Sequence, residues 1–152
     1  MLVLTITYPH VSFKTDWTTG KTNPVDLWMT ASTIKKYQTY VGDVKSYLDP
    51  EHPRDLFQYP DYMVDYEKLR QIKKRALNDK QNHRTPILIA VFPTYIAIWD
   101  LNKVSWEGTA EWRLVNQKGV DYGKKEWELM AFLPTAGDDV LIIPYKVDKL
   151  KN

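Results

Sequence analysis

The sequence predicts a mixed α/β domain, with a central mixed β-sheet flanked by helices. Two near-continuous apolar runs, 86–92 and 95–101, are separated only by Pro93-Thr94 and are typical of a hairpin whose strands are covered on both faces. A stretch with helical periodicity, 62–77, precedes them, and residues 25–45 alternate in the manner of strands. Strands before and after a helix therefore point to an α/β arrangement rather than an all-β or all-α one.

Composition is that of one globular domain spanning 1–152. The chain is 43% hydrophobic and 26% charged and shows no repeat or composition shift that would separate a second domain. No apolar run reaches the ~20 residues of a membrane-spanning helix. Residues 1–8 are expected to form a strand rather than a signal peptide. With no cysteine to form disulfides or zinc-thiolate sites, a cytoplasmic protein without a membrane is expected.

The first half of the chain is expected to begin with strands. The Thr-rich segment 11–23 is expected to be a turn or an irregular crossing. Segments 25–30 and 34–45 are predicted strands, with the turn near 31–33. Gly42, late in the second of these, indicates a bulge or a close approach of two backbones, so that the residue after it would lie at a strand distortion.

A predicted loop and helix follow. Residues 46–61 contain three prolines among charged residues and are predicted to be a loop. The helix is expected over 62–77, with Asp61 as its N-cap. One apolar stripe recurs at spacings of three and four: Met63, Tyr66, Leu69, Ile72 and Ala76.

The last third is predicted to be a β-rich extension, residues 102–145. Turns are expected at 106–108 and 117–119, and strands at 110–115, 126–133 and 140–143. A loop is expected at 134–139, and 146–152 is a polar tail.

Charged residues at the ends of the two predicted strands give the sharpest chemical signal. Asp26 follows Asn23-Pro24-Val25, and Asp43-Val44-Lys45 closes the next strand. Since side chains of a strand alternate between its faces, Asp43 and Lys45 are expected on one face. Two acids and a lysine converging there would form a divalent-metal site with a cation beside it. The alternatives are a strand-edge acid at Asp26 and an exposed ion pair between Asp43 and Lys45, which would contribute little stability.

This pattern resembles the PD-(D/E)xK nuclease-like superfamily. Pro-Val-Asp followed by Asp-x-Lys at the end of a β run is similar to the family motif, and the succession strand, strand, helix, strand, strand over roughly 20–101 is similar to its core. The resemblance implies a restriction-endonuclease-like fold and a nuclease that depends on Mg²⁺ or Mn²⁺ and hydrolyses DNA. It also suggests a phage or mobile-element origin. Many family members carry an acidic residue on a helix before the first core strand; here no helical pattern precedes residue 24, and Asp16 is the one acid before Asp26.

The resemblance also implies roles for particular residues. Asp26 and Asp43 would be metal ligands, together with the backbone carbonyl of Val44. Lys45 would orient or deprotonate the attacking water or stabilise developing charge. Lys68, on the predicted helix, matches a position where relatives often carry a basic or polar residue near the site; the alternative is a solvated lysine in the charge pattern of the helix.

A basic cluster is the candidate DNA contact. It comprises Lys73, Lys74, Arg75, Lys80 and Arg84. Because the net charge is only +2, binding DNA would require such cations to gather on one face. The alternative is a helix C-terminus carrying cations that complement its dipole.

Other functions remain open. The chain lacks a Gly-x-Ser-x-Gly elbow, a Walker-type loop and a Gly-x-Gly-x-x-Gly fingerprint, and cysteine catalysis is excluded. His52 beside Glu51 could touch a metal, although a solvated loop histidine is the simpler interpretation. One rival function is a catalytically inactive nuclease fold that binds nucleic acid or a partner protein. Another is an unrelated structural or interaction protein that uses its tryptophan-rich C-terminal third. A homodimer or a subunit of a larger assembly is possible.

Overall fold

Strands dominate the architecture, which is mixed α and β. The computed structural model describes residues 12–17, 27–32, 37–81, 83–116 and 124–145. The elements, with η for 3₁₀ helices, are β1 (Ser12–Trp17), β2 (Leu27–Ser32), β3 (Tyr37–Ser46), η1 (Leu56–Gln58), β4 (Asp61–Asp65), α1 (Tyr66–Asn78), β5 (Thr85–Val91), β6 (Tyr95–Asp100), η2 (Glu107–Thr109), β7 (Glu111–Asn116), β8 (Lys125–Pro134) and β9 (Leu141–Pro144). The mixed class is confirmed, but the described residues form two sheets and one α-helix rather than one sheet with several helices.

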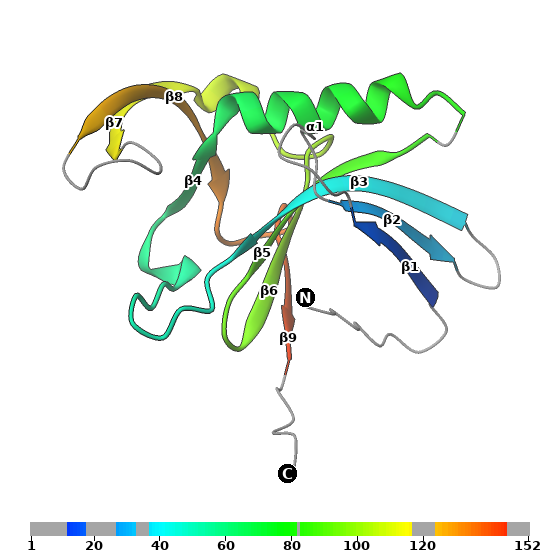
Figure 1. Cartoon of the computed structure of the whole chain (residues 1–152), viewed down its shortest axis with the longest axis horizontal. Coiled ribbons are helices and arrows are strands. Elements are labelled where there is room, and N and C mark those ends of the chain that lie inside the picture. The colour runs from blue at the N-terminus through cyan, green and yellow to red at the C-terminus, as the bar shows by residue number, and fades with distance from the viewer. Residues whose placement is uncertain (1–11, 18–26, 33–36, 82, 117–123, 146–152) are drawn as a thin grey trace, which may run out of the picture.

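The larger sheet has six strands in the order β1-β2-β3-β5-β6-β9 (Figure 1). Its strand pairs are antiparallel except β3 and β5, which run parallel. A parallel pair needs a long crossover, and here the crossover carries β4 and α1. This arrangement brings α1 over the part of the sheet formed by β3 and β5 (Figure 1).

Both faces of the central strands are covered, as the continuous apolar runs predicted. On one face, Leu69 and Ile72 of α1 pack in a cluster with Val41 of β3 and Leu88 of β5, all fully buried. Ile87 and Ile89 belong to a second buried cluster on the opposite face. Each fully buried aliphatic side chain contributes roughly 1.5–3 kcal/mol. The predicted helical stripe is confirmed at Leu69, Ile72 and Ala76, which are its buried residues.

The smaller sheet has three strands in the order β4-β8-β7, all antiparallel. Its strand β4 corrects the sequence analysis, which began the helix at Tyr62 with Asp61 as N-cap. Residues 61–65 instead pair with residues 130–134 of β8. Met63, assigned to the helical stripe, therefore lies on β4 and is 44% exposed.

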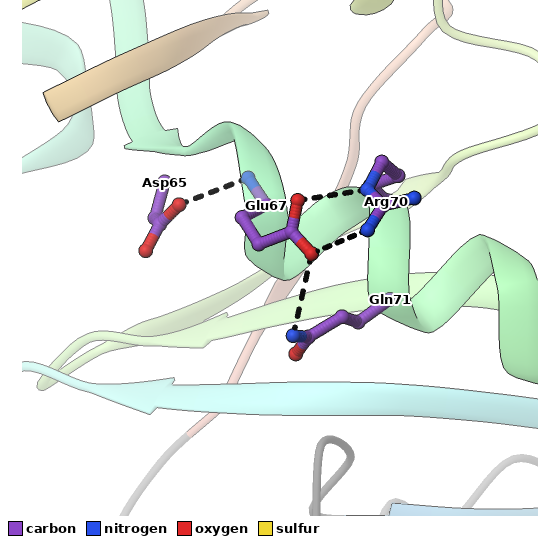
Figure 2. Close-up of polar contacts among 4 residues, drawn as sticks. All are labelled: Asp65, Glu67, Arg70 and Gln71. Carbon is purple, nitrogen blue, oxygen red and sulfur yellow. Dashed lines mark hydrogen bonds and ion pairs between the residues drawn. The ribbon is translucent and has the colours of Figure 1, made fainter.

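The helix begins after Asp65. The carboxylate of Asp65 accepts a hydrogen bond of 2.9 Å from the backbone N–H of Glu67, as an N-cap does (Figure 2). Glu67 in turn accepts two 2.7 Å hydrogen bonds from Arg70, one turn further along, and one from Gln71 (Figure 2). These contacts fix the start of α1 and thus the side chains of its first turn.

The other predicted elements agree with the structure to within a few residues, with one exception. The segment 12–17, expected to be irregular, forms β1 and pairs with β2. The predicted strands at 1–8, the turn at 117–119 and the tail at 146–152 lie outside the described residues. Among those described, no helix has the length and apolar character needed to cross a membrane.

Candidate active site

Asp43 lies in the middle of the protein, on the face of the sheet that α1 covers. It is two residues after Val41 on β3, so the two side chains share a face, and Val41 belongs to the α1-side cluster. Its parallel partner in the register is Leu88. Asp43 is 0% exposed and is the only carboxylate among the buried residues that the structure describes.

Two lysines hold this buried carboxylate. Lys45, on the same face of β3, places its Nζ 3.3 Å from Oδ2 of Asp43. Lys68, from the first turn of α1, places its Nζ 3.3 Å from Oδ1. Burying a carboxylate costs several kcal/mol unless it is paired, so these contacts stabilise its charged form where it lies. Because Asp43 is fully buried, the interpretation of Asp43 and Lys45 as an exposed surface pair is wrong.

The lysines connect the buried acid to the solvent. The side chain of Lys45 is 39% exposed and that of Lys68 is 23% exposed, whereas that of Asp43 is 0% exposed. An anion arriving from solvent would therefore meet the ammonium groups before the carboxylate. Lys68 is not the fully solvated helix lysine of the alternative interpretation.

Gly42 explains how β3 delivers Asp43 so deep in the fold. A Cβ at position 42 would lie 2.5 Å from the carbonyl oxygen of Ile87 and 2.8 Å from its Cγ1, so only glycine fits. The predicted close backbone approach is confirmed. The pairing with β5 continues without interruption from Tyr40 to Ser46, so the predicted distortion at Asp43 is wrong.

The charges decide which ligands the site fits. Asp43, Lys45 and Lys68 carry one carboxylate and two ammonium groups, which together leave one positive charge. Mg²⁺ prefers anionic oxygen ligands, so the donor set fits this ion when a second carboxylate joins Asp43. Asp26, the predicted second ligand, lies outside the described residues. The described pairing of β2 with β3 ends with Leu27 opposite Gly42. In the sequence, Asp26 directly precedes Leu27, and Asp43 directly follows Gly42.

The predicted metal ligand Val44 lies in the paired part of β3. It sits opposite Ile89 in the parallel register, between Asp43 and Lys45 in the sequence. Its side chain packs against the second apolar cluster, on the sheet face away from α1. The side chain thus anchors the strand, and only its backbone carbonyl is a candidate ligand.

Two members of the predicted basic cluster are engaged in ion pairs, and Lys73, Lys80 and Arg84 line one pocket. Lys73 pairs with Glu107 at 2.6 Å, and Arg84 pairs with Asp79 at 2.6 Å and donates a hydrogen bond to the carbonyl of Tyr40. These two cations therefore tie α1 and β5 to their neighbours. The remaining members, all exposed, are Lys74, Arg75 and Lys80.

A second acidic group lies in the loop after β3. One ligand atom each from Asp49, Glu51 and His52 lies within 4.8 Å of the others, and all three residues are exposed. The His52 ring is 2.9 Å from Asp49, and this hydrogen bond is the main cause of the lowered pKa of the Asp49 carboxyl. Hydrogen bonds within the loop account for this cluster, so it is not needed to explain the site around Asp43.

Two tyrosines beside the site were not singled out from the sequence. Tyr47 follows Lys45 by two residues, and its hydroxyl contacts that of Tyr62 on β4. Burial raises the pKa of the Tyr62 phenol, the neighbouring Tyr47 raises it further, and the charge of Asp43 adds to the shift. The period-two spacing from Asp43 through Lys45 to Tyr47 was the available signal, whereas Tyr62 comes from a strand predicted as helix.

No family model matches the chain, and the searches of curated proteins and of solved structures give no match either. The functional inference therefore rests on the residues of the site.

Proposed function

We propose that the protein is a divalent-metal-dependent nuclease that hydrolyses DNA phosphodiester bonds, built on a restriction-endonuclease-like core. The observation that carries the proposal is the fully buried Asp43 with Lys45 and Lys68 on its two oxygens. A buried ionic cluster of this kind gains little net stability over an apolar one, so a chemical role is a reasonable explanation for it. The succession β2, β3, α1, β5, β6 supports the proposed core, with β4 as an addition to it.

Each residue of the site has a role in this proposal. Asp43 and Asp26 would hold Mg²⁺ or Mn²⁺, and the backbone carbonyl of Val44 would be a further ligand. When bound, the ion would acidify a coordinated water and neutralise charge on the phosphate. Lys45, as an ammonium, orients the attacking water and stabilises the negative charge that develops as the water attacks. Lys68 draws the scissile phosphate toward Asp43 and offsets the charge that develops on its oxygens.

The two lysines reach Asp43 from different elements of the fold. Lys45 shares a strand face with Asp43, so its reach is fixed by the backbone of β3. Lys68 comes from a helix, whose position over the sheet depends on the packing of Leu69 and Ile72. Both lysines thus come from regular elements, which hold functional side chains more precisely than loops do.

A cleavage assay on labelled single-stranded, duplex and branched DNA tests the proposal. With Mg²⁺ or Mn²⁺ the wild type should cleave at least one substrate, and EDTA should abolish cleavage. Asp43→Asn and Lys45→Ala should each reduce the rate by about 10²–10⁴-fold, the range of general acid–base and metal-ligand contributions. Lys103→Ala, at an exposed lysine, is the matched control and should leave the rate unchanged. Equal inactivity of the wild type and variants on all substrates would exclude the nuclease proposal.

A protein-interaction role is the second candidate, and one surface favours it. Trp112 and Trp127 are each 65% exposed and Leu114 is 48% exposed. Leu114 lies opposite Trp127 in the β7–β8 register, so these side chains share one face of the smaller sheet. Exposed apolar groups gathered on one face mark contact sites. If this face joins two copies of the chain, light scattering will show a dimer that Trp112→Ser with Trp127→Ser converts to monomer.

A further inference from the structure

A cavity of about 700 Å³ opens beside the candidate active site. Its volume lies within the range of about 300–1,000 Å³ typical of pockets for small ligands. One wall comes from the larger sheet, through Tyr47 and Phe92, and the other from the smaller sheet, through Met63, Arg113 and Phe132. The loop of residues 53–60 lines the rest, including Arg54 and Tyr59.

The cavity adjoins Asp43 through two of its lining residues. Tyr47 follows Lys45 by two residues at the end of β3, and its backbone N–H still donates to the carbonyl of Val91 across the sheet. Tyr62 of β4, whose hydroxyl contacts that of Tyr47, lines the cavity beside it. None of Asp43, Lys45 and Lys68 lines the cavity, so a ligand in it would meet the lysines only through a neighbouring group such as a phosphate.

The lining combines aromatic rings that are already stacked with guanidinium groups above them, and its most exposed ring is that of Tyr59, at 64%. Tyr47 stacks on Phe92 with ring centroids 5.1 Å apart, and the guanidinium of Arg54 lies 5.6 Å from the Tyr47 centroid. The guanidinium of Arg113 lies 5.3 Å from the centroid of Phe132. Planar rings and guanidinium groups are the surfaces on which proteins stack unpaired bases.

Some polar groups of the cavity already have hydrogen-bond or ion-pair partners within the protein. Asp55 accepts hydrogen bonds from the Tyr95 hydroxyl and the backbone of Phe57, and Arg113 pairs with Glu111 at 2.7 Å. Asp61 is exposed at the rim, and among the described residues no ion pair of Arg54 occurs. The cationic Arg54 is therefore the side chain best placed to receive a ligand that is both flat and anionic.

We propose that this cavity binds an unpaired nucleobase of a DNA strand whose neighbouring phosphate lies against Lys45 and Lys68. The inference rests on the proposed nuclease function and names its substrate class: single-stranded DNA or a frayed strand end. Bases inside a duplex are stacked on their neighbours and must be unstacked at a cost of a few kcal/mol before a pocket can take them. A stacking pocket therefore selects DNA that is already unpaired.

The test is DNA binding without metal, so that it does not depend on cleavage. In EDTA, fluorescence anisotropy would follow titration of the full chain into a labelled single-stranded oligonucleotide and into a labelled hairpin duplex of equal length, with unlabelled dTMP as a competitor. Tyr59→Ala removes a ring that is 64% exposed, and Arg54→Ala removes the guanidinium over Tyr47. Each should weaken binding of the single strand by about 5- to 150-fold, the loss of one stacked base. Duplex binding should be weaker than single-strand binding and should change little.

Matched controls separate the pocket from general surface effects. Leu77→Ala removes an apolar side chain that is 68% exposed and lies outside the cavity lining, and Lys103→Ala removes an exposed cation outside it. Both should bind the single strand as the wild type does. Unchanged single-strand binding by Tyr59→Ala and Arg54→Ala would overturn the inference, as would equal losses on the duplex, or dTMP competing as well as the whole strand. A protein that binds as expected but does not cleave would refute the nuclease function and leave the pocket intact.

Discussion

Gly42→Ala should destabilise the protein and disturb the candidate site together. The added Cβ would lie 2.5 Å from the backbone carbonyl oxygen of Ile87, well inside the 3.0 Å below which real Cβ atoms essentially never approach other atoms. The obstacle is backbone in a parallel pair, so relief requires β3 and β5 to move apart. Overpacking of this kind costs about 1–3 kcal/mol. For a chain of this length the corresponding fall in Tm is about 2–12 °C.

Urea denaturation followed by circular dichroism would measure this loss. Gly108→Ala is the matched control, because nothing lies within 4 Å of a Cβ built there, and its unfolding free energy should change by less than about 0.5 kcal/mol. Since Gly42 directly precedes Asp43, the same substitution should also lower the rate in the cleavage assay. An unfolding free energy for Gly42→Ala within about 0.5 kcal/mol of the wild type would refute the steric reasoning.

Two further predictions concern the cap of α1 and one tyrosine. Asp65→Ala removes the hydrogen bond to the Glu67 N–H and should lower the free energy of unfolding, measured in urea, by about 0.5–2 kcal/mol. Asp61→Ala should lower it by less than about 0.5 kcal/mol, and equal losses would show that Asp65 is not the N-cap. Burial, followed by the hydrogen bond to Asp55, raises the pKa of Tyr95 to about 12, above the ordinary phenol value of 10.0. The contribution of Tyr95 to stability is therefore complete below pH 10 and is lost as the pH rises toward 12. Tyr95→Phe should therefore lose less stability than the wild type over this interval in pH-dependent denaturation, and parallel curves would contradict the assignment.

The central strands could be predicted because their signal is local. Residues 86–92 and 95–101 are apolar without alternation, and this pattern arises when helices or chain segments cover both faces of a sheet. The two buried clusters on opposite faces of β5 are the physical origin of the pattern. The tertiary packing of these two strands agrees with their local preference for strand structure, so the sequence was sufficient to predict them.

The start of the helix could not be predicted because it depends on a distant strand. Residues 61–65 contain two possible N-caps, Asp61 and Asp65, and an apolar spacing that fits either a helix or a strand. The choice is made by β8, whose residues 130–134 pair with them from about seventy positions away. β1 was missed because it lies in the polar segment 11–23, which lacks a clear strand alternation; its described partner is β2.

The candidate site could likewise be predicted where it depends on local sequence, but not where it depends on contacts between distant segments. Asp43 and Lys45 could be placed on one face from the period of a strand, but the complete burial of Asp43 follows from α1 lying over it. The contact of Lys68 with Asp43 needs the helix in its observed position, which in the sequence was only an implication of the family resemblance. The aromatic cavity was out of reach, because Tyr47, Tyr59 and Phe132 come from segments that the fold alone brings together.

The net charge around Asp43 bears on whether the candidate site cleaves nucleic acid or only holds it. With one carboxylate and two lysines, Asp43, Lys45 and Lys68 carry a net positive charge that suits a phosphate, so the proposed function predicts some DNA binding without metal. A second carboxylate from Asp26 would cancel that charge, and a divalent cation held between the acids would then strengthen binding of the phosphate above its level without metal. The metal dependence of binding, measured separately from cleavage, therefore distinguishes an active nuclease site from one that only holds nucleic acid.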